Sequence, residues 1–243
     1  MSPPAFTLNP ALDADRLRDD YRRLGRVRIH DFLVGDGPDR LLADLSERGD
    51  WRQVLNSGDK LYELDQAARA SLTAAQLAAL DEAVHADARH GFQYRYEAIR
   101  VPDGLGDRQA STDILAQFAS WLSSPAVLAF LARVTGATDA RFADSQATAY
   151  GPGDFLTAHS DGVAGKDRRA AYVFSLNPQW RAEWGGLLLF HGADGAVEGV
   201  APGFNTLDLL AVPQPHSVSY VNRAAAGRRY SITGWLRAQP QPG

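Results

Sequence analysis

The chain contains no cysteine among its 243 residues. This absence excludes disulfide bridges, zinc sites with thiolate ligands, cysteine-ligated iron–sulfur clusters and cysteine nucleophiles. A cysteine-free chain fits a reducing compartment, and we expect a cytoplasmic protein. Residues 1–10 lack the basic and apolar regions of a signal peptide, and no apolar run reaches the roughly 18 to 20 residues that cross a bilayer. We therefore expect no membrane partner.

An excess of positive charge is also missing. The net charge is −4 and the pI is about 5.8, so the sequence predicts no large basic surface for nucleic acid. We expect no nucleic-acid partner. The length of 243 residues and the hydrophobic content of 45% suit a single globular domain with a sizeable core, which we expect to span residues 1–243.

The first part of the chain, residues 1–138, is predicted to be helix-rich and to support the rest. Apolar residues at helical spacing predict five helices, and Ser71 or Thr73 is expected to cap the third. These helices cover residues 12–24, 39–48, 74–90, 112–122 and 125–135. Strands are expected at 26–33, 51–55 and 92–100. The charged segment 101–111 contains two glycines and is predicted to be an exposed loop.

The pattern changes at residue 139, where short strands begin to alternate with Gly, Pro and Asn. Eight strands are predicted, at 142–150, 154–159, 170–177, 186–191, 196–200, 205–211, 216–222 and 229–237. Strands of this length and spacing favour a sandwich or barrel over repeated βαβ units. The expected fold class is therefore α+β, with a mainly β core over residues 139–237.

A candidate metal site begins with His159 and Asp161. Residues two apart in an extended segment point to the same side, so this segment offers an imidazole and a carboxylate to one ion. Two histidines and one carboxylate with open positions are typical of non-haem Fe(II) oxygenases. The candidates for the third ligand are His30, His85, His90, His191 and His216. We favour His216, which begins a strand directly after two prolines that restrict the backbone.

Arg229 is the candidate partner for a carboxylate ligand. Residues 216–222 and 229–235 are predicted to form a hairpin, in which alternation places Arg229 on the same inner face as His216. A planar guanidinium in that position binds a carboxylate with two parallel hydrogen bonds. Ser231 follows on the same face. Arg228 is expected to point to the other side, as a solvated surface charge.

Tyr150 is a second candidate for this carboxylate. It ends a strand nine residues before His159 and precedes Gly151–Gly153, so its phenol is placed to enter the same cavity. A core tyrosine with a satisfied hydroxyl is the alternative.

Together these residues resemble the Fe(II)/2-oxoglutarate dioxygenases of the prolyl 4-hydroxylase type. The resemblance covers roughly residues 140–237, where a tyrosine, an HxD pair, a paired-glycine turn, a distal histidine and a basic residue occur in the family's order. It is carried by segments 150–161, 169–177, 180–190 and 216–235. The ending RYSITGW is most similar to the branch that hydroxylates a prolyl residue in a ribosomal protein.

The resemblance implies a double-stranded β-helix (a jelly roll, cupin-like). It also implies that His159, Asp161 and His216 bind Fe(II), and that Arg229 and Tyr150 hold the C5 carboxylate of 2-oxoglutarate. O2 is the expected cosubstrate and ascorbate an expected stimulant, and no catalytic residue is expected beyond the metal ligands. The presence of Asp161 favours hydroxylation, because related halogenases lack this carboxylate. Leu187 departs from the family, since many relatives carry an acidic residue after the paired glycines.

Three functions remain open from the sequence. The first is a hydroxylase of prolyl residues in a protein or peptide, the second uses the same chemistry on a free amino acid or another small-molecule substrate, and the third is a cupin-like binding protein without turnover. Phe92, Tyr94 and Tyr96 either border a substrate groove or fill the core. Trp180 and Trp184 either meet a substrate or cover the edge of the sheet. The loop 162–168 is a candidate lid or peptide contact.

Overall fold

The computed structural model describes residues 6–238. Its α-helices are α1 (Ala14–Leu24), α2 (Gly37–Glu47), α3 (Gln66–Ala70), α4 (Ala74–Ala88), α5 (Leu105–Ala110), α6 (Ile114–Leu122) and α7 (Pro125–Thr135), with a short 3-10 helix at Ala182–Trp184. Its early strands are β1 (Thr7–Leu8), β2 (Arg26–Ile29), β3 (Leu33–Val34), β4 (Arg52–Ser57), β5 (Lys60–Leu64) and β6 (Tyr94–Arg100). The later strands are β7 (Phe142–Ala143), β8 (Gln146–Tyr150), β9 (Phe155–His159), β10 (Arg168–Leu176), β11 (Leu188–His191), β12 (Val197–Val200), β13 (Phe204–Ala211), β14 (His216–Val218) and β15 (Arg229–Arg237).

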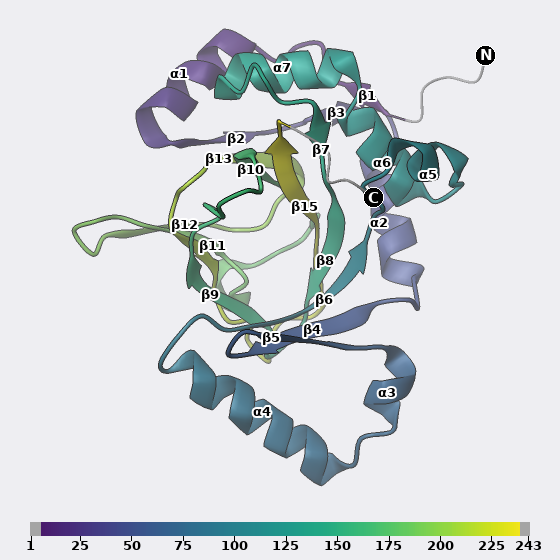
Figure 1. The fold of residues 1–243 in the computed structure, drawn as a ribbon, viewed down its shortest axis with the longest axis vertical. Coiled ribbons are helices and arrows are strands. Elements are labelled where there is room, and N and C mark those ends of the chain that lie inside the picture. Colours follow the sequence, from purple (N-terminus) through teal and green to yellow (C-terminus); the bar gives the residue numbers. More distant parts are fainter. Residues whose placement is uncertain (1–5, 239–243) are drawn as a thin grey trace.

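Most strands belong to one antiparallel sheet that curls on itself. The strand order is β12-β11-β14-β9-β6-β8-β15-β10-β13-β2, with the β4–β5 hairpin attached to β6. Figure 1 shows β9, β11 and β12 on one side of the curled sheet and β8 and β15 on the other. The two sides face each other, so alternate residues of β8, β10, β13 and β15 point into the space between them.

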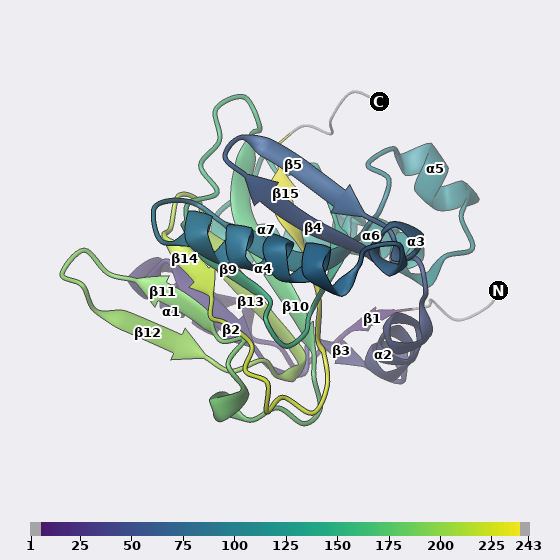
Figure 2. The same ribbon diagram turned by 90° about the horizontal axis from the view of Figure 1, so that it is seen from below.

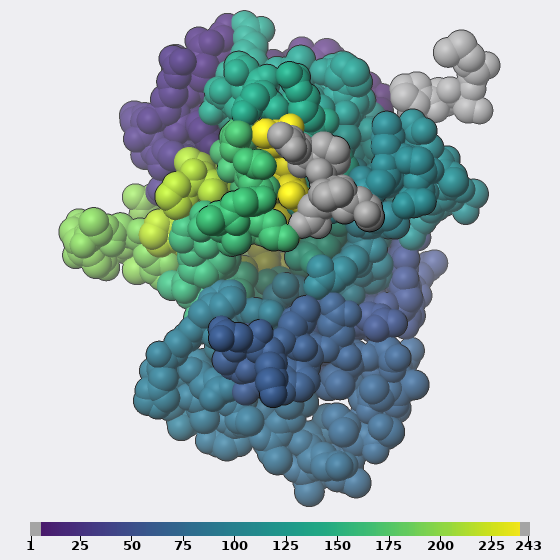
Figure 3. All heavy atoms as spheres, in the orientation of Figure 1, coloured from purple at the N-terminus to yellow at the C-terminus, as the bar shows by residue number. Residues whose placement is uncertain are grey.

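The outer face of the sheet carries the main apolar core. Buried residues of β10, β13 and β15, among them Phe174, Leu209 and Ile232, pack against helices α1, α2, α6 and α7. Phe118 of α6 stacks on Phe174 with ring centroids 5.2 Å apart, a contact worth about 1 kcal/mol beyond the buried area. Figure 3 shows α1 and α7 side by side at the top and the blue residues of α4 at the opposite end. The helices thus anchor the strands whose inner residues form the site.

Helix ends follow local signals that the sequence contains. Asp13 caps α1 by accepting hydrogen bonds from the backbone N–H groups of Asp15 and Arg16, and Gly25 ends the helix with φ of 68°. Thr73, rather than Ser71, caps α4, where it forms a reciprocal capping box with Gln76.

The first part of the chain contributes more strands to the sheet than its pattern predicts. The hairpin partner β5 was not predicted, because its residues are mostly exposed and show no apolar alternation. Figure 2 shows the β4–β5 hairpin beside α4. The predicted strand 142–150 is divided, since β7 and β8 are separated by Asp144 and Ser145.

The prediction of an exposed loop over 101–111 is confirmed in that most of its residues are exposed, and wrong in that the segment is not a loop throughout. The segment contains α5, and the Arg108 side chain is fully buried. Its guanidinium donates hydrogen bonds to the carbonyl oxygens of Pro102 and Ala143. Burying this charge is tolerated because carbonyl groups satisfy its Nε and Nη1 donors, whereas Nη2 has no hydrogen-bond partner among the described residues. Composition alone does not reveal this arrangement.

Among residues 6–238, no single helix is long and apolar enough to cross a membrane. The helices α6 and α7 meet that criterion only as a pair, across a bend of 58°.

Candidate active site

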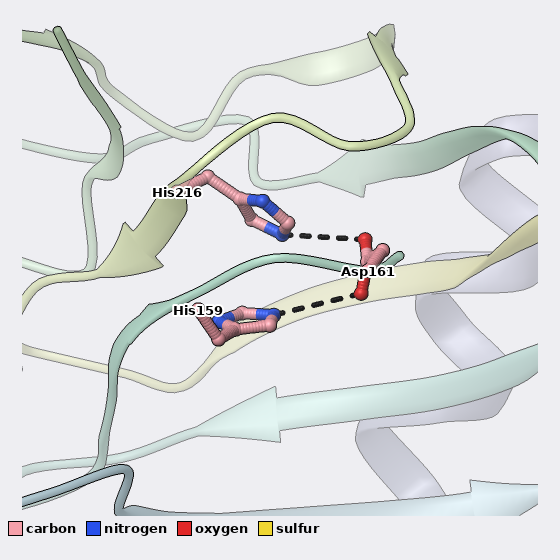
Figure 4. Close-up of side chains that lie close together, drawn as sticks. All are labelled: His159, Asp161 and His216. Atoms are coloured by element: carbon pink, nitrogen blue, oxygen red, sulfur yellow. Dashed lines mark ion pairs between the residues drawn. The ribbon is translucent and has the colours of Figure 1, made fainter. Parts of the chain in front are cut away.

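The structure brings His159, Asp161 and His216 together. Strands β9 and β14 pair with His159 directly opposite His216, and Asp161 follows two residues after the end of β9. The Asp161 carboxylate oxygens lie 3.7 Å from Nε2 of His159 and 3.5 Å from Nε2 of His216. Figure 4 shows both rings turned toward the carboxylate. One ligand atom from each residue lies within 4.8 Å of the others.

Backbone carbonyl groups set the tautomer of both imidazoles. Nδ1 of His159 lies 3.1 Å from the Thr157 carbonyl oxygen, and Nδ1 of His216 lies 2.9 Å from that of Gln214. When Nδ1–H donates to these oxygens, Nε2 keeps its lone pair for a metal. Burial, and then the neighbouring His216, lower the pKa of His159, which favours the neutral ring that binds metals.

This donor set fits a ferrous ion. Two neutral imidazoles and one carboxylate on one side of an ion leave the other coordination positions open. The arrangement supports the predicted choice of His216 over the other histidines. His191, one strand away on β11, instead bonds to the Ser217 hydroxyl at 2.9 Å and lies outside the three-residue group.

A cavity of about 570 Å³, here called the site cavity, extends from these three residues into the barrel. The metal end of the site cavity is the part lined by His159, Asp161 and His216, and its closed end is the part lined by Arg229 and Tyr150. Arg229 is 2% exposed. Among the described residues its guanidinium has no hydrogen bond or ion pair, and its Nε is buried without a partner.

The unpaired, buried guanidinium of Arg229 is the feature of the closed end that indicates a bound ligand. Burial lowers the pKa of Arg229. A guanidinium stays protonated in proteins, so the group remains a cation. A buried charge is destabilising unless it is paired. A carboxylate that enters the site cavity supplies the missing partner.

Arg229 reaches the closed end by a different route from the predicted one. The predicted hairpin of 216–222 with 229–235 is wrong, because β14 pairs with β9 and β11 whereas β15 pairs with β7, β8 and β10. The connection between β14 and β15 crosses from one side of the barrel to the other. Arg229 therefore lies opposite Tyr150 in the sheet, and both line the same cavity as His216.

Tyr150 contributes a neutral phenol to the closed end. The Arg229 guanidinium lies 5.1 Å from the centroid of the Tyr150 ring, which stacks on Tyr96 at 5.2 Å. Burial raises the pKa of Tyr150 well above its usual value, so the hydroxyl keeps its proton and can donate a hydrogen bond.

Arg228 is not the solvated surface charge that alternation suggested. It points away from the site cavity, as expected, but forms an ion pair with Glu97 and lies 5.1 Å from the Trp51 ring. The prediction failed because Glu97 of β6 and the rings of Trp51 and Tyr230 lie beside the Arg228 guanidinium.

Arg168 and Trp235 stand beside the metal end, and the sequence interpretation gave them no role there. The Arg168 guanidinium lies 3.5 Å above the Trp235 ring and donates a hydrogen bond to the Asp161 carbonyl oxygen at 3.2 Å. Arg168 had been noted only as the end of the loop 162–168. Its position seven residues after Asp161, at the start of an inner strand, was the available signal.

The aromatic residues divide between the two roles that the sequence left open. Phe92, Tyr94 and Tyr96 line the site cavity, in line with the alternation of β6. Trp180 and Trp184 do not line it; they contact each other edge to face at 5.3 Å, and Nε1 of Trp180 donates to the Gly185 carbonyl oxygen. They hold the paired-glycine turn that precedes Leu187.

Comparison with known proteins finds a similarity in the strand-rich part of the chain. Residues 145–237 match the family model of the 2OG-Fe(II) oxygenase superfamily. The chain is therefore similar to that superfamily over its strand-rich part. A search of curated proteins found no match. The description of that family names iron and 2-oxoglutarate, and the group of His159, Asp161 and His216 fits an iron site.

Solved structures of low identity share the fold over nearly the whole chain. A Pseudomonas putida prolyl-4-hydroxylase is 18% identical, with a TM-score of 0.59 and 97% of each chain covered. A 2OG-Fe(II) oxygenase family oxidoreductase from Burkholderia pseudomallei is 14% identical, with a TM-score of 0.61, 97% of this chain covered and 95% of that one. A Trichoplax adhaerens prolyl hydroxylase, in complex with a hypoxia inducible factor peptide fragment, is 16% identical with a TM-score of 0.60 and coverage of 93% and 89%. These likenesses confirm the predicted double-stranded β-helix.

Proposed function

We propose that the protein is an Fe(II)/2-oxoglutarate-dependent hydroxylase in which His159, Asp161 and His216 bind the iron. The observation that carries this proposal is the unpaired Arg229 at the closed end of a cavity whose other end holds the three ligands. A dicarboxylate that chelates a metal with its 2-oxo acid group places its second carboxylate at this arginine. Arg229 binds that group, and Tyr150 donates a further hydrogen bond.

When bound with 2-oxoglutarate and O2, iron supplies the oxidation of a C–H bond to an alcohol, with succinate and CO2 as the other products. The residues of the chain bind and orient the metal and the cosubstrate, and they exclude water. The barrel wall shields the closed end, and the carbonyl groups of Thr157 and Gln214 keep both imidazoles oriented. No general base is required, and we propose that no residue beyond the ligands is catalytic.

For the substrate we propose a prolyl residue within a protein or peptide. A groove of about 500 Å³ adjoins the metal end and shares Gln146, Arg168, Thr233 and Trp235 with the site cavity. A substrate that continues beyond the reacting residue therefore has room along the surface. The Arg168 guanidinium, which lies over the Trp235 ring, suits a peptide carbonyl.

The similar structures point in the same direction. Two of them are named as prolyl hydroxylases, and one of these holds a peptide fragment. The ending RYSITGW supports the branch that acts on a ribosomal protein. Ascorbate as a stimulant and a single domain over residues 1–243 are also part of this proposal. The absence of cysteine supports a cytoplasmic location.

The test is to incubate the Fe(II)-loaded protein with 2-oxoglutarate and a cell extract, and to search by mass spectrometry for the gain of one oxygen. We expect a prolyl peptide to gain oxygen, with release of succinate, and the Asp161→Ala variant to abolish both. Oxygen on a free amino acid or another metabolite alone contradicts the prolyl substrate. Failure of the wild type to convert 2-oxoglutarate, with any extract, leaves the cupin-like binding protein.

A further inference from the structure

Near Arg229, but outside the residues that line the site cavity, three buried hydroxyl groups have no partners. In the described part of the chain, Oγ of Ser175, Oγ of Ser231 and Oγ1 of Thr206 have neither a hydrogen-bond partner nor contact with solvent. The three residues are 1%, 0% and 4% exposed. Buried hydroxyl groups are nearly always hydrogen-bonded, so three such groups beside an unpaired guanidinium need an explanation.

The three residues form one row across adjacent strands, here called the hydroxyl row. Ser231 of β15 lies opposite Ser175 of β10, which in turn lies opposite Thr206 of β13. Directly opposed residues of antiparallel strands point to the same face. Ser231 is two residues from Arg229 on the same strand, so the hydroxyl row lies on the inner face next to the guanidinium.

The charges around the hydroxyl row leave one positive charge without compensation. Asp208 lies on the same face of β13 and receives two hydrogen bonds from Arg28, at 2.7 and 2.8 Å. This ion pair is neutral as a unit. Both of its members influence the pKa of Arg229, which shows that they lie within electrostatic reach of it. The closed end therefore has a net charge of +1, which matches a single carboxylate.

A carboxylate at Arg229 also supplies what the hydroxyl groups lack. A hydroxyl donates one hydrogen bond, and a carboxylate accepts about four. A serine changes the direction of its Oγ by moving between staggered rotamers, without a change in the backbone. Ser175 and Ser231 are directly opposed, so both hydroxyl groups can turn toward the same bound group.

We propose that Ser175 is a binding residue for the distal carboxylate of the cosubstrate, to which it donates a hydrogen bond together with Ser231 and beside Arg229. Thr206 supports Ser175 from the next strand. This inference rests on the proposed function. Its consequence is a pair of opposite effects, because the unpaired hydroxyl destabilises the ligand-free protein and strengthens the bound state.

The test compares wild type with the Ser175→Ala variant, both loaded with Mn(II) in place of iron. Calorimetric titration with 2-oxoglutarate is expected to show affinity about tenfold weaker in the variant, the loss that accompanies removal of a hydrogen bond to a charged group. The melting temperature of the ligand-free variant is expected to equal or exceed that of the wild type. If Ser175 has only a structural role, its replacement changes the melting temperature but not the affinity for 2-oxoglutarate.

Two controls separate the causes. The five-carbon acid 2-oxopentanoate lacks the distal carboxylate, and we expect it to bind wild type and Ser175→Ala equally. Ser120 of α6 also has a buried hydroxyl without a partner, far from the site cavity, so Ser120→Ala should leave the 2-oxoglutarate affinity unchanged.

The outcomes are distinct. If wild type and Ser175→Ala bind 2-oxoglutarate with the same affinity, this inference is overturned and the proposed function stands. If Ser175→Ala weakens the binding of 2-oxopentanoate as much as that of 2-oxoglutarate, this inference is also overturned, because the serine then does not act on the distal carboxylate. Wild type that does not bind 2-oxoglutarate overturns the proposed function and this inference with it.

Discussion

The two ends of the site cavity differ in how their polar groups are satisfied before any ligand binds. At the metal end, Nδ1 of both histidines has a backbone carbonyl partner, and the Asp161 carboxylate faces both rings. At the closed end, Arg229 and the hydroxyl row are buried without partners. The metal end is oriented by its own backbone, whereas the closed end is completed only by a ligand.

This difference teaches how the two ends divide their tasks. Prearranged ligands lower the cost of ordering when a metal binds. Unpaired buried groups destabilise the ligand-free protein, and that destabilisation is relieved on binding of a suitable anion. We therefore expect changes at the metal end to remove the chemistry, and changes at the closed end to alter cosubstrate affinity and stability in opposite directions.

The largest effect is expected at the metal end. Asp161→Ala should lower 2-oxoglutarate turnover by more than about 100-fold. Loss of a residue that only orients a metal ligand costs at most about that much, and Asp161 is itself a proposed ligand. Mn(II) titration followed by electron paramagnetic resonance should show loss of tight binding, with an unchanged circular dichroism spectrum. Asp194→Ala, in the exposed turn after β11, is the control. Full turnover in Asp161→Ala would discard the metal assignment.

The next effect contrasts two arginines near the closed end. Arg229→Met removes an unpaired charge, so we expect the KM for 2-oxoglutarate to rise about 30-fold or more, with little change in kcat and no loss of ligand-free stability. Arg28→Met leaves Asp208 buried and unpaired, and should cost about 3–5 kcal/mol in the free energy of unfolding. Urea unfolding measures the stabilities. Equal destabilisation by both changes would show that Arg229 already has a partner.

A pH effect of intermediate size comes from a carboxyl group outside both ends. Burial raises the pKa of Asp144 to about 6. The folded state then holds its proton more tightly than the unfolded state does, so this stabilisation is complete below about pH 4 and is lost as the pH rises through 6. Asp144→Asn should remove up to about 3 kcal/mol of this dependence. Urea unfolding between pH 4 and 7 tests this, and an unchanged slope in the variant speaks against it.

The smallest effect is expected for Tyr150→Phe. The change removes one hydroxyl donor from the closed end and should raise the KM for 2-oxoglutarate about fivefold. Tyr172 provides a matched control, because its hydroxyl is bonded to Ser145 and to the Asp144 carbonyl oxygen. Tyr172→Phe should therefore lower stability and leave this KM unchanged. The reverse pattern would place the cosubstrate nearer to Tyr172.

The metal end was predictable because two of its three residues are close together in the sequence. The spacing of His159 and Asp161 places both side chains on one face of an extended segment whatever the rest of the fold. The third ligand required a pairing between β9 and β14, for which the rigid Pro213 and Pro215 gave only an indirect signal. Strand positions were also largely predictable, since turn residues mark their ends.

The pairing of strands was less predictable. Sequential strands usually neighbour each other, and this tendency favoured the wrong hairpin of 216–222 with 229–235. The hydroxyl row could not be foreseen either, because Ser175, Ser231 and Thr206 come together only through the register of three strands. Arg108 likewise looks like a loop residue until its carbonyl partners are in place.

The most direct measurement is an oxygen-free crystal structure with Mn(II) and 2-oxoglutarate. The account predicts a metal bound by Nε2 of His159, Nε2 of His216 and the Asp161 carboxylate, with the distal carboxylate of 2-oxoglutarate on the Arg229 guanidinium. A metal bound elsewhere, or a distal carboxylate that leaves Arg229 unpaired, would contradict it.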